Sequence, residues 1–225
     1  MPAYAIVHKM KKTPKIPEAT ITRLSLYCRH LDRLEFDGHR LVSSEKLARL
    51  CQVNPAQVRK DLGYFGEFGV RGVGYDVGDL KRELKKILAV NREWNMGIVG
   101  IGHLGSSLLQ SPIFQARGFN FVAAFDVDID KIEKPLSCGL IILGVGELKE
   151  TVKRLNIRIG VITTPPAVAQ TIADLFVNSK VNAILNFSPV QVHVPSSCRV
   201  ENIDLTIKLD ILAFKLKHEL GINPK

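Results

Sequence analysis

Three glycines at the spacing of a phosphate-binding loop carry the clearest chemistry in the chain. The loop consists of Gly100, Ile101, Gly102, His103, Leu104 and Gly105. It follows a short apolar run and opens a segment with helical spacing, which is the context that makes this pattern specific. The first glycine permits a tight turn, the second lets backbone approach a pyrophosphate, and the third allows close packing of helix on strand. The positive end of the helix would stabilise phosphate charge.

An acidic residue completes this pattern. Asp126 stands 21 residues after Gly105, at the end of the next apolar run, where a carboxylate can accept hydrogen bonds from the hydroxyls of an adenine ribose. The next residue, Val127, supplies no arginine for a 2′-phosphate, so we expect NAD(H) rather than NADP(H). His103 is expected to face phosphate or solvent and not to act as a base. The alternative is a glycine-rich turn that binds no ligand.

A second group of basic and polar residues lies on a short predicted helix over residues 55–64. Spacing of 100° per residue turns Val58, Leu62 and Phe65 inward. The residues expected to contact DNA are Gln57, Arg59, Lys60 and Tyr64. Arginine and lysine bind guanine edges or phosphates, glutamine can read adenine, and a tyrosine hydroxyl can reach phosphate. The alternative is a solvated helix face around Lys60 and Asp61.

Local signals around this helix predict the elements that hold it. A first helix is expected over residues 17–36, where apolar residues recur at helical spacing. Ser43 or Ser44 can cap a second helix, and Asn54 followed by Pro55 gives the cap and first position of the third. Two short helices separated by about three residues are typical of a helix-turn-helix.

Glycines alternate with aromatic and β-branched residues over residues 65–75, which predicts a glycine-tipped β-hairpin. Such a hairpin beside a helix-turn-helix would form a wing, and Arg71 at its tip could enter the minor groove. Asp76 can cap a further helix over residues 77–90. Residues 91–95 are expected to form the boundary with a second domain.

The apolar pattern changes after residue 96 to short runs that alternate with helical stretches. Strands are expected over residues 96–99, 119–125, 157–163 and 181–187, with weaker candidates at 140–143 and 199–203. Helices are expected over residues 103–115, 146–155, 167–177 and 205–220. Strands that are apolar throughout and alternate with helices indicate a parallel sheet covered on both faces, hence an α/β fold. The apolar stripe of the last helix has no place left on that sheet and is expected to pack on a partner subunit.

Composition and charge narrow the class of protein. Of the net charge of +9, residues 1–90 carry +7, which favours a polyanionic partner such as nucleic acid; scattered surface lysines are the alternative. No run approaches the roughly 18 apolar residues of a membrane span, and the first 15 residues lack the apolar core of a signal peptide, so we expect a cytoplasmic protein without a membrane partner. The four cysteines have no zinc-site spacing, and we expect no metal.

Catalysis is not expected. A winged helix and a dinucleotide domain use nearly the whole chain, which leaves no substrate domain for a hydride acceptor. His193 and His218 pair with no carboxylate by sequence, so neither is a candidate base. Two alternatives stay open: an NAD-dependent oxidoreductase that has acquired a DNA-binding arm, and a CoA-binding or scaffold module on the same fold.

The chain resembles Rex, a family of NADH-sensing transcriptional repressors of bacteria, from about residue 16 to residue 216. The matching motifs are Ile16-Pro17, residues 57–62, 64–66 and 71–75, the glycine loop, residues 125–128 and residues 184–187. The resemblance implies a homodimer with winged helices, Rossmann-like domains and an exchanged last helix. It also implies binding to an inverted-repeat operator as repressor and release by NADH. The cofactor site is expected to include Thr163, Asn186 and Phe187 as well as the loop and Asp126.

The domains then follow: a flexible basic arm over 1–15, a winged helix-turn-helix domain over 16–90, a Rossmann-like NAD(H)-binding domain over 95–203 and an exchanged dimerisation helix over 204–225. The resemblance also implies a switch in which Arg29 pairs with Asp204 in one state. Ser111 stands where the family has a participating tyrosine, and Leu205 where some members have an aromatic residue near the nicotinamide. A serine cannot span the same distance to a carboxylate, so the switch is expected to differ in detail.

Overall fold

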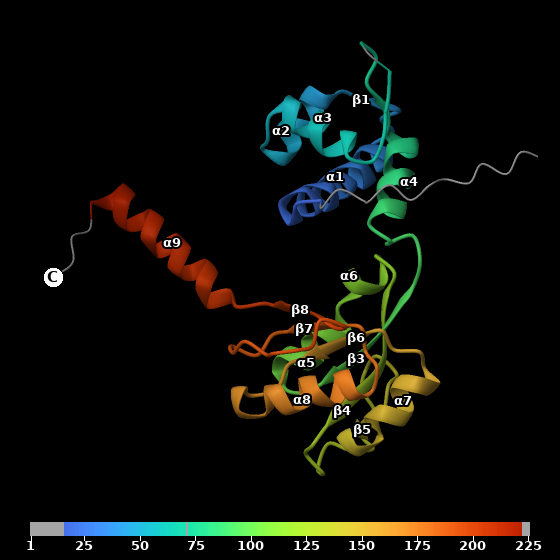
Figure 1. The fold of residues 1–225 in the computed structure, drawn as a ribbon, viewed down its shortest axis with the longest axis vertical. Helices are drawn as coiled ribbons and strands as arrows, with labels where there is room; N and C mark the ends of the chain where they lie inside the picture. Colours follow the sequence, from blue (N-terminus) through green and yellow to red (C-terminus); the bar gives the residue numbers. More distant parts are fainter. Residues whose placement is uncertain (1–15, 71, 222–225) are drawn as a thin grey trace, which may run out of the picture. The chain divides into compact units, whose positions relative to one another are not determined.

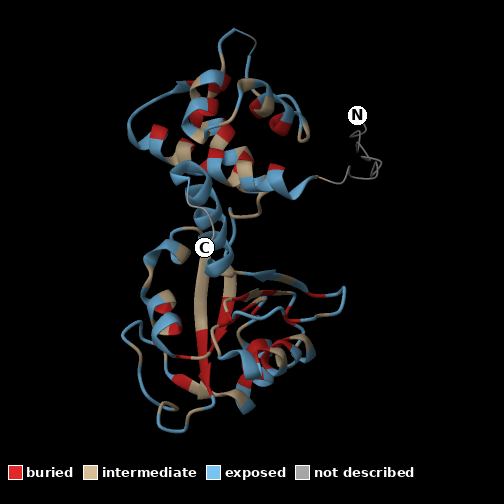
Figure 2. Cartoon of the chain, turned by 90° about the vertical axis from the view of Figure 1, so that its left-hand side faces the viewer, coloured by how far each residue is buried: buried red, intermediate tan, exposed pale blue. Residues whose placement is uncertain are grey.

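The computed structural model describes residues 16–70 and 72–221, and Figure 1 shows its helices and strands. The chain divides after Arg92 into two compact units. The buried residues lie inside the helical bundle of the first unit, and along the strands and the inner sides of the covering helices in the second (Figure 2). The expected arm over 1–15 and the residue expected at the wing tip, Arg71, lie outside the described residues.

Four helices lie in the described part of the first unit. They are α1 (Glu18–Phe36), α2 (Ser44–Cys51), α3 (Pro55–Gly63) and α4 (Val77–Ile87). The predicted caps Ser43, Asn54 and Asp76 each accept a hydrogen bond from the N–H three residues later, so local sequence alone starts α2, α3 and α4. Apolar residues of all four helices share one core, and α2 and α3 lie side by side (Figure 1). This confirms the helix-turn-helix.

The β-hairpin predicted over residues 65–75 is present in part. Val70 and Gly74 form an isolated antiparallel bridge, but strand β2 (Tyr75–Asp76) pairs antiparallel with β1 (Leu41–Val42) and not within the glycine-rich segment. Four glycines with positive φ prevent an extended strand there: Gly66, Gly69, Gly72 and Gly74. A Cβ on Gly74 would lie 2.6 Å from the carbonyl oxygen of Val42, so the close approach to β1 requires glycine. We call residues 66–74 the glycine turn.

The helix expected over residues 77–90 ends earlier, at Ile87. Ala89 takes a left-handed φ of 54°, and the N–H of Val90 donates back to the carbonyl of Lys85 at 3.0 Å. This hydrogen bond satisfies a carbonyl at the helix end and turns the chain out of the helix.

A six-stranded parallel sheet forms the second unit, as predicted. Its strands stand in the order β5-β4-β3-β6-β7-β8, and every neighbouring pair is parallel. The bounds are β3 (Trp94–Val99), β4 (Phe119–Asp126), β5 (Ile142–Gly144), β6 (Ile159–Ile162), β7 (Ala183–Asn186) and β8 (Arg199–Asn202). This confirms the Rossmann-like α/β architecture. The order reverses at β3, whose two neighbours are β4 and β6.

Helices cover both faces of this sheet. On one face, α7 (Leu148–Arg154) and α8 (Pro166–Asn178) pack side chains such as Val152 and Phe176 against Val99 and Phe125. On the other, α5 (His103–Gln110) and α6 (Pro112–Gln115) pack against Ile98 and Ala124. A short 3-10 turn, η1 (Val145–Glu147), precedes α7. Successive strand residues thus point to opposite faces, and both faces are apolar.

The helix expected over residues 103–115 is broken in two. Ser111 between α5 and α6 has φ −78° and ψ 119°, which is extended backbone. Pro112 causes the break, because proline lacks the N–H that would continue the helix and disfavours a helical conformation in the residue before it.

The last helix, α9 (Leu205–Leu220), has the predicted bounds but buries none of its side chains. Leu209, Leu212, Phe214 and Leu216 are 49–64% exposed. Within the described part of the chain, no helix combines the length and the hydropathy needed to cross a membrane.

Candidate functional site

The glycine loop is shaped by close backbone contacts between β3, α5 and β6. Gly100 has φ +100°, and a Cβ there would lie 2.9 Å from the backbone of Thr163. A Cβ on Gly105 would lie 2.2 Å from the carbonyl oxygen of Gly100, so the helix reaches the strand only because this residue is glycine. A Cβ on exposed Gly102 would meet nothing within 4 Å. The first and third glycines therefore shape the loop, and the second leaves space above it.

The end of β6 lies next to this loop, and hydroxyl groups follow both β6 and β7. Thr163 donates its hydroxyl to the carbonyls of Val99 and Gly100, at 3.1 and 2.7 Å, and so ties β6 to the loop. The hydroxyls of Thr164 and Ser188 are buried and have no hydrogen-bond partner among the described residues. Because buried polar atoms are rarely left unpaired, these two are candidate ligand contacts.

Asn186 and Phe187, expected at the cofactor, differ in what they contact. The amide of Asn186 donates to the carbonyls of Ser188 and Val190 and to Asn202, at 2.7–3.3 Å, and its oxygen accepts from the N–H of Ser188. It is fully buried and holds the chain where it leaves β7. Phe187 is half-buried against the core on the α5 side.

Asp126 is 95% buried at the end of β4 and is tied to the glycine loop. One carboxylate oxygen accepts the N–H of Ile101 at 2.8 Å and lies 3.2 Å from the Lys131 ammonium; the other accepts the N–H groups of Val127 and Asp128 at 2.8 and 3.0 Å. Burial raises the pKa of Asp126, but these donors lower it by more, so the pKa lies below its ordinary value. Sequence reasoning missed Lys131, which follows Asp126 by five residues in a loop without periodic signal.

This arrangement fits a dinucleotide. The loop follows β3 and the unpaired Thr164 follows β6, so both lie at the carboxyl edge of the sheet where the strand order reverses. Ligands of open α/β sheets bind at that point. Open space over Gly102, the N-terminus of α5 and an anchored carboxylate after β4 match a pyrophosphate and its ribose.

In the first unit, the side chains of the predicted recognition helix α3 have different surroundings. Lys60 is exposed and makes no ion pair within the described residues. Gln57 is half-buried and donates its amide to Asp61 at 2.8 Å. Arg59 donates to the Ser44 hydroxyl at 2.9 Å and lies 3.7 Å from Glu45. Tyr64 is half-buried at the end of α3.

Asp61 is not part of a solvated face, because its side chain is fully buried between α3 and α1. Arg23 donates to both carboxylate oxygens at 2.6 and 2.7 Å, Tyr27 donates at 2.8 Å and Thr20 at 3.2 Å. Burial raises the pKa of Asp61, but hydrogen bonds from Arg23, Tyr27 and Gln57 outweigh it, and the pKa lies below 3.8. Helix α3 is thus fastened to α1 by an ionised pair.

Comparison with known proteins agrees with the division of the chain into two units. Residues 15–63 match a family model described as putative DNA-binding protein N-terminus, and residues 91–190 match one described as CoA binding domain. The redox-sensing transcriptional repressor Rex of Syntrophobacter fumaroxidans is 53% identical over 205 residues, covering 91% of this chain and 98% of that protein. The chain belongs to the Rex family. Rex of Desulforamulus reducens is 50% identical, covering 91% of this chain and 97% of its own.

Solved structures of a Rex-family repressor also match. RSP in complex with β-NAD+ and operator DNA has a TM-score of 0.87 and 32% identity, covering 91% of this chain and 94% of that one. RSP in complex with β-NADH has a TM-score of 0.82 and 30% identity, covering 91% and 96%.

The residues expected in the Rex switch lie in different units. Arg29 is exposed on α1. Asp204 caps α9 by accepting the N–H and hydroxyl of Thr206 at 2.8 and 2.6 Å, which lower the pKa of Asp204. Ser111 is half-buried at the break between α5 and α6.

Proposed function

We propose that this Rex-family chain represses transcription by binding operator DNA through its first unit and is released when NADH binds the carboxyl edge of its sheet. One observation carries the ligand assignment. A glycine loop that only glycine can form lies beside a buried, unpaired threonine hydroxyl at the point where the strand order reverses. Family membership and the Rex-family structures with NAD+, NADH and operator DNA support both halves of the proposal.

Each residue at the sheet edge has a proposed role. Gly102 and the first turn of α5 hold the pyrophosphate, while Thr164 and Ser188 supply hydrogen bonds from the ends of β6 and β7. Asp126 positions the loop, and its contact with Lys131 is the one that a ribose hydroxyl would replace. Thr163, Asn186 and Phe187 hold the surrounding backbone and core.

The DNA-binding roles follow from what each α3 side chain contacts. Lys60 is exposed without an ion pair in the described structure and is proposed to contact DNA directly. Arg59 is proposed to contact backbone phosphate. Gln57 is fastened to Asp61, so we assign it first to positioning α3. Tyr64 and Arg71 remain proposed DNA contacts from the residue types alone.

Lys60→Ala is expected to weaken operator binding about tenfold or more, because a direct contact and its charge are lost, and to leave NADH affinity unchanged. Anisotropy of a labelled operator at fixed salt measures the first, and NADH fluorescence the second. Lys153→Ala makes the same charge change at an exposed position of α7 and should have little effect on either. Loss of NADH binding in Lys60→Ala would contradict the assignment of DNA binding to the first unit and of NADH binding to the second.

The switch rests on thermodynamic linkage. If NADH binds better to a form of the protein that binds operator poorly, each ligand must weaken the binding of the other by the same factor. We propose that Arg29 and Asp204 contribute to the difference between the two forms, with Ser111 replacing a tyrosine in it. Half-sites of an inverted repeat lie about one helical turn apart, so a dimer must hold its recognition helices at a matching spacing.

We propose further that α9 packs on a second copy of the chain to form this homodimer. Its apolar side chains between Leu205 and Leu220 are 45–69% exposed where they are large, and contiguous exposed apolar residues of this kind mark interaction surfaces. Sedimentation of the whole chain should give twice the mass of 25.0 kDa, and a monomer at micromolar concentration would contradict the proposal.

NADH is proposed to act as a regulatory ligand and not as a hydride donor, since the curated relatives are named repressors. In this proposal each residue of the cofactor site binds NADH or positions the backbone around it, and none transfers a proton. We propose that the protein acts in the cytoplasm, where it would meet operator DNA. Steady consumption of NADH by the pure protein with an added carbonyl substrate would favour the oxidoreductase alternative.

A further inference from the structure

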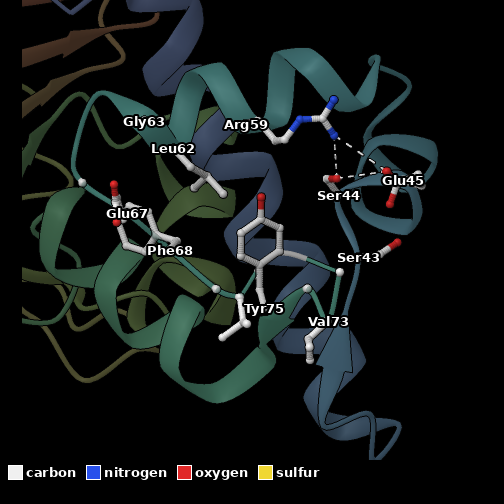
Figure 3. A pocket seen from close by; sticks show the side chains of 15 residues that line it. Ser43, Ser44, Glu45, Arg59, Leu62, Gly63, Glu67, Phe68, Val73 and Tyr75 are labelled. Atoms are coloured by element: carbon white, nitrogen blue, oxygen red, sulfur yellow. Dashed lines mark hydrogen bonds and ion pairs between the residues drawn. The ribbon is translucent and has the colours of Figure 1, made fainter.

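A cavity of about 700 Å³ lies in the first unit between α3, the start of α2 and the glycine turn (Figure 3). Polar side chains line it from separate elements: Ser44 and Glu45 from α2, Arg59 from α3, Glu67 from the glycine turn and Tyr75 from β2. The DNA-binding function proposed above does not use this cavity as a whole.

The cavity already holds an anion of the protein itself. The carboxylate of Glu45 accepts the Ser44 hydroxyl at 3.2 Å and lies 3.7 Å from Arg59, which also donates to Ser44. The N–H of Glu45 and the Ser43 hydroxyl lower the pKa of Glu45. These donors belong to the first turn of α2, where backbone N–H groups and the helix dipole favour negative charge.

Tyr75 brings a donor that nothing in the described structure uses. The residue is only 8% exposed, and its hydroxyl makes no hydrogen bond among the described residues. Figure 3 shows the hydroxyl pointing into the cavity, on the side where Arg59 and Ser44 lie. Burial raises the pKa of Tyr75, and Arg59 opposes this shift. The hydroxyl therefore stays protonated and can donate at neutral pH.

We propose that this cavity binds a backbone phosphate of DNA, held by the Arg59 guanidinium and the Tyr75 hydroxyl, and that the phosphate displaces the Glu45 carboxylate from Arg59. The proposal rests on the DNA-binding function proposed above. A phosphodiester suits the site because the cavity joins the recognition helix to the glycine turn, and because residues 1–90 carry most of the positive charge. Glu45 then limits affinity by competing with the phosphate.

Glu45→Gln removes the competing charge and keeps the side-chain shape. It is expected to raise affinity about two- to fivefold, the range of an exposed ion pair, and to do so equally for the operator and for an unrelated duplex. Tyr75→Phe keeps the ring and loses only the hydroxyl. It is expected to lower affinity for both duplexes about tenfold, because a hydrogen bond to a charged phosphate is lost.

The experiment is an anisotropy titration of both duplexes at two salt concentrations, with melting temperatures measured in parallel. Glu201→Gln on exposed β8 makes the same charge change and should not alter DNA affinity. The phosphate site is overturned if Glu45→Gln leaves affinity for the unrelated duplex unchanged, or if Tyr75→Phe binds DNA like the parent. It is also overturned if inorganic phosphate raises the melting temperature of Glu45→Gln while DNA affinity stays the same. In each of these cases, if Lys60→Ala still lowers operator affinity, the proposed DNA-binding function is not contradicted.

Discussion

Asp61→Ala is expected to lower the free energy of unfolding of the first unit by about 3–5 kcal/mol, the usual cost of breaking a buried ion pair on one side. The variant leaves the Arg23 guanidinium without its carboxylate and removes the acceptor of Tyr27 and Gln57. Because this pair fastens α3 to α1, operator binding should be lost at concentrations where the parent binds fully. Urea denaturation followed by circular dichroism measures the first effect and anisotropy the second.

The matched control is Asp79→Ala in the same unit. Asp79 pairs with Arg82 on the surface, with side chains that are 71% and 62% exposed, so its loss should cost no more than about 1 kcal/mol. NADH should bind Asp61→Ala with parent affinity. Equal stability of the two variants would show that the buried pair does not fasten α3.

The same pair sets an acid limit on stability. The pKa of Asp61 is lowered in the folded protein from an ordinary value of 3.8, so the stabilisation is fully present above about pH 3.8 and is lost as pH falls through the lower folded value. Asp61→Asn should lack this part of the acid transition, because its amide does not titrate.

Asp126→Ala is expected to weaken NADH binding at least tenfold, which is the second large effect. The carboxylate accepts the N–H groups of Ile101, Val127 and Asp128, and its loss leaves all three without that acceptor. A glycine loop that is no longer held cannot present its backbone to a pyrophosphate at low cost. By linkage, the NADH concentration that releases operator should rise by the same factor, while operator affinity without NADH stays unchanged.

Asp130→Ala provides the control, since Asp130 lies in the same loop but is exposed. It should bind NADH like the parent. Isothermal calorimetry gives NADH affinity for both variants. If Asp126→Ala bound NADH normally, the residue would have no part in the cofactor site.

Local sequence was sufficient wherever neighbouring residues decide the structure. Ser43, Asn54 and Asp76 cap helices through N–H groups three residues away, and the six predicted runs became the six strands of the parallel sheet. Periodicity failed where proline or glycine overrode it. Pro112 divided a helix that the apolar pattern continued, and glycines with positive φ gave the strand at Tyr75 a distant partner in β1.

Long-range contacts explain what the sequence could not predict at the sites. The partners of Asp61 on α1 stand 34 to 41 residues away, so nothing near Asp61 distinguishes it from a solvated residue beside Lys60. Asp126 was found from its spacing to the glycine loop, but its hydrogen bond to Ile101 spans 25 residues. The unpaired hydroxyls of Thr164 and Ser188 are visible only when burial is known.

NADH, and separately NAD+, should be titrated into the protein bound to a labelled inverted-repeat operator. This titration tests directly whether NADH controls DNA binding by this chain. Anisotropy is recorded at fixed salt, because salt alone shifts such affinities. CoA serves as a third ligand, since residues 91–190 also match a CoA binding domain model. We expect release at a much lower concentration of NADH than of NAD+, and none by CoA. Binding of NADH to the protein without release of the operator would contradict NADH control of DNA binding.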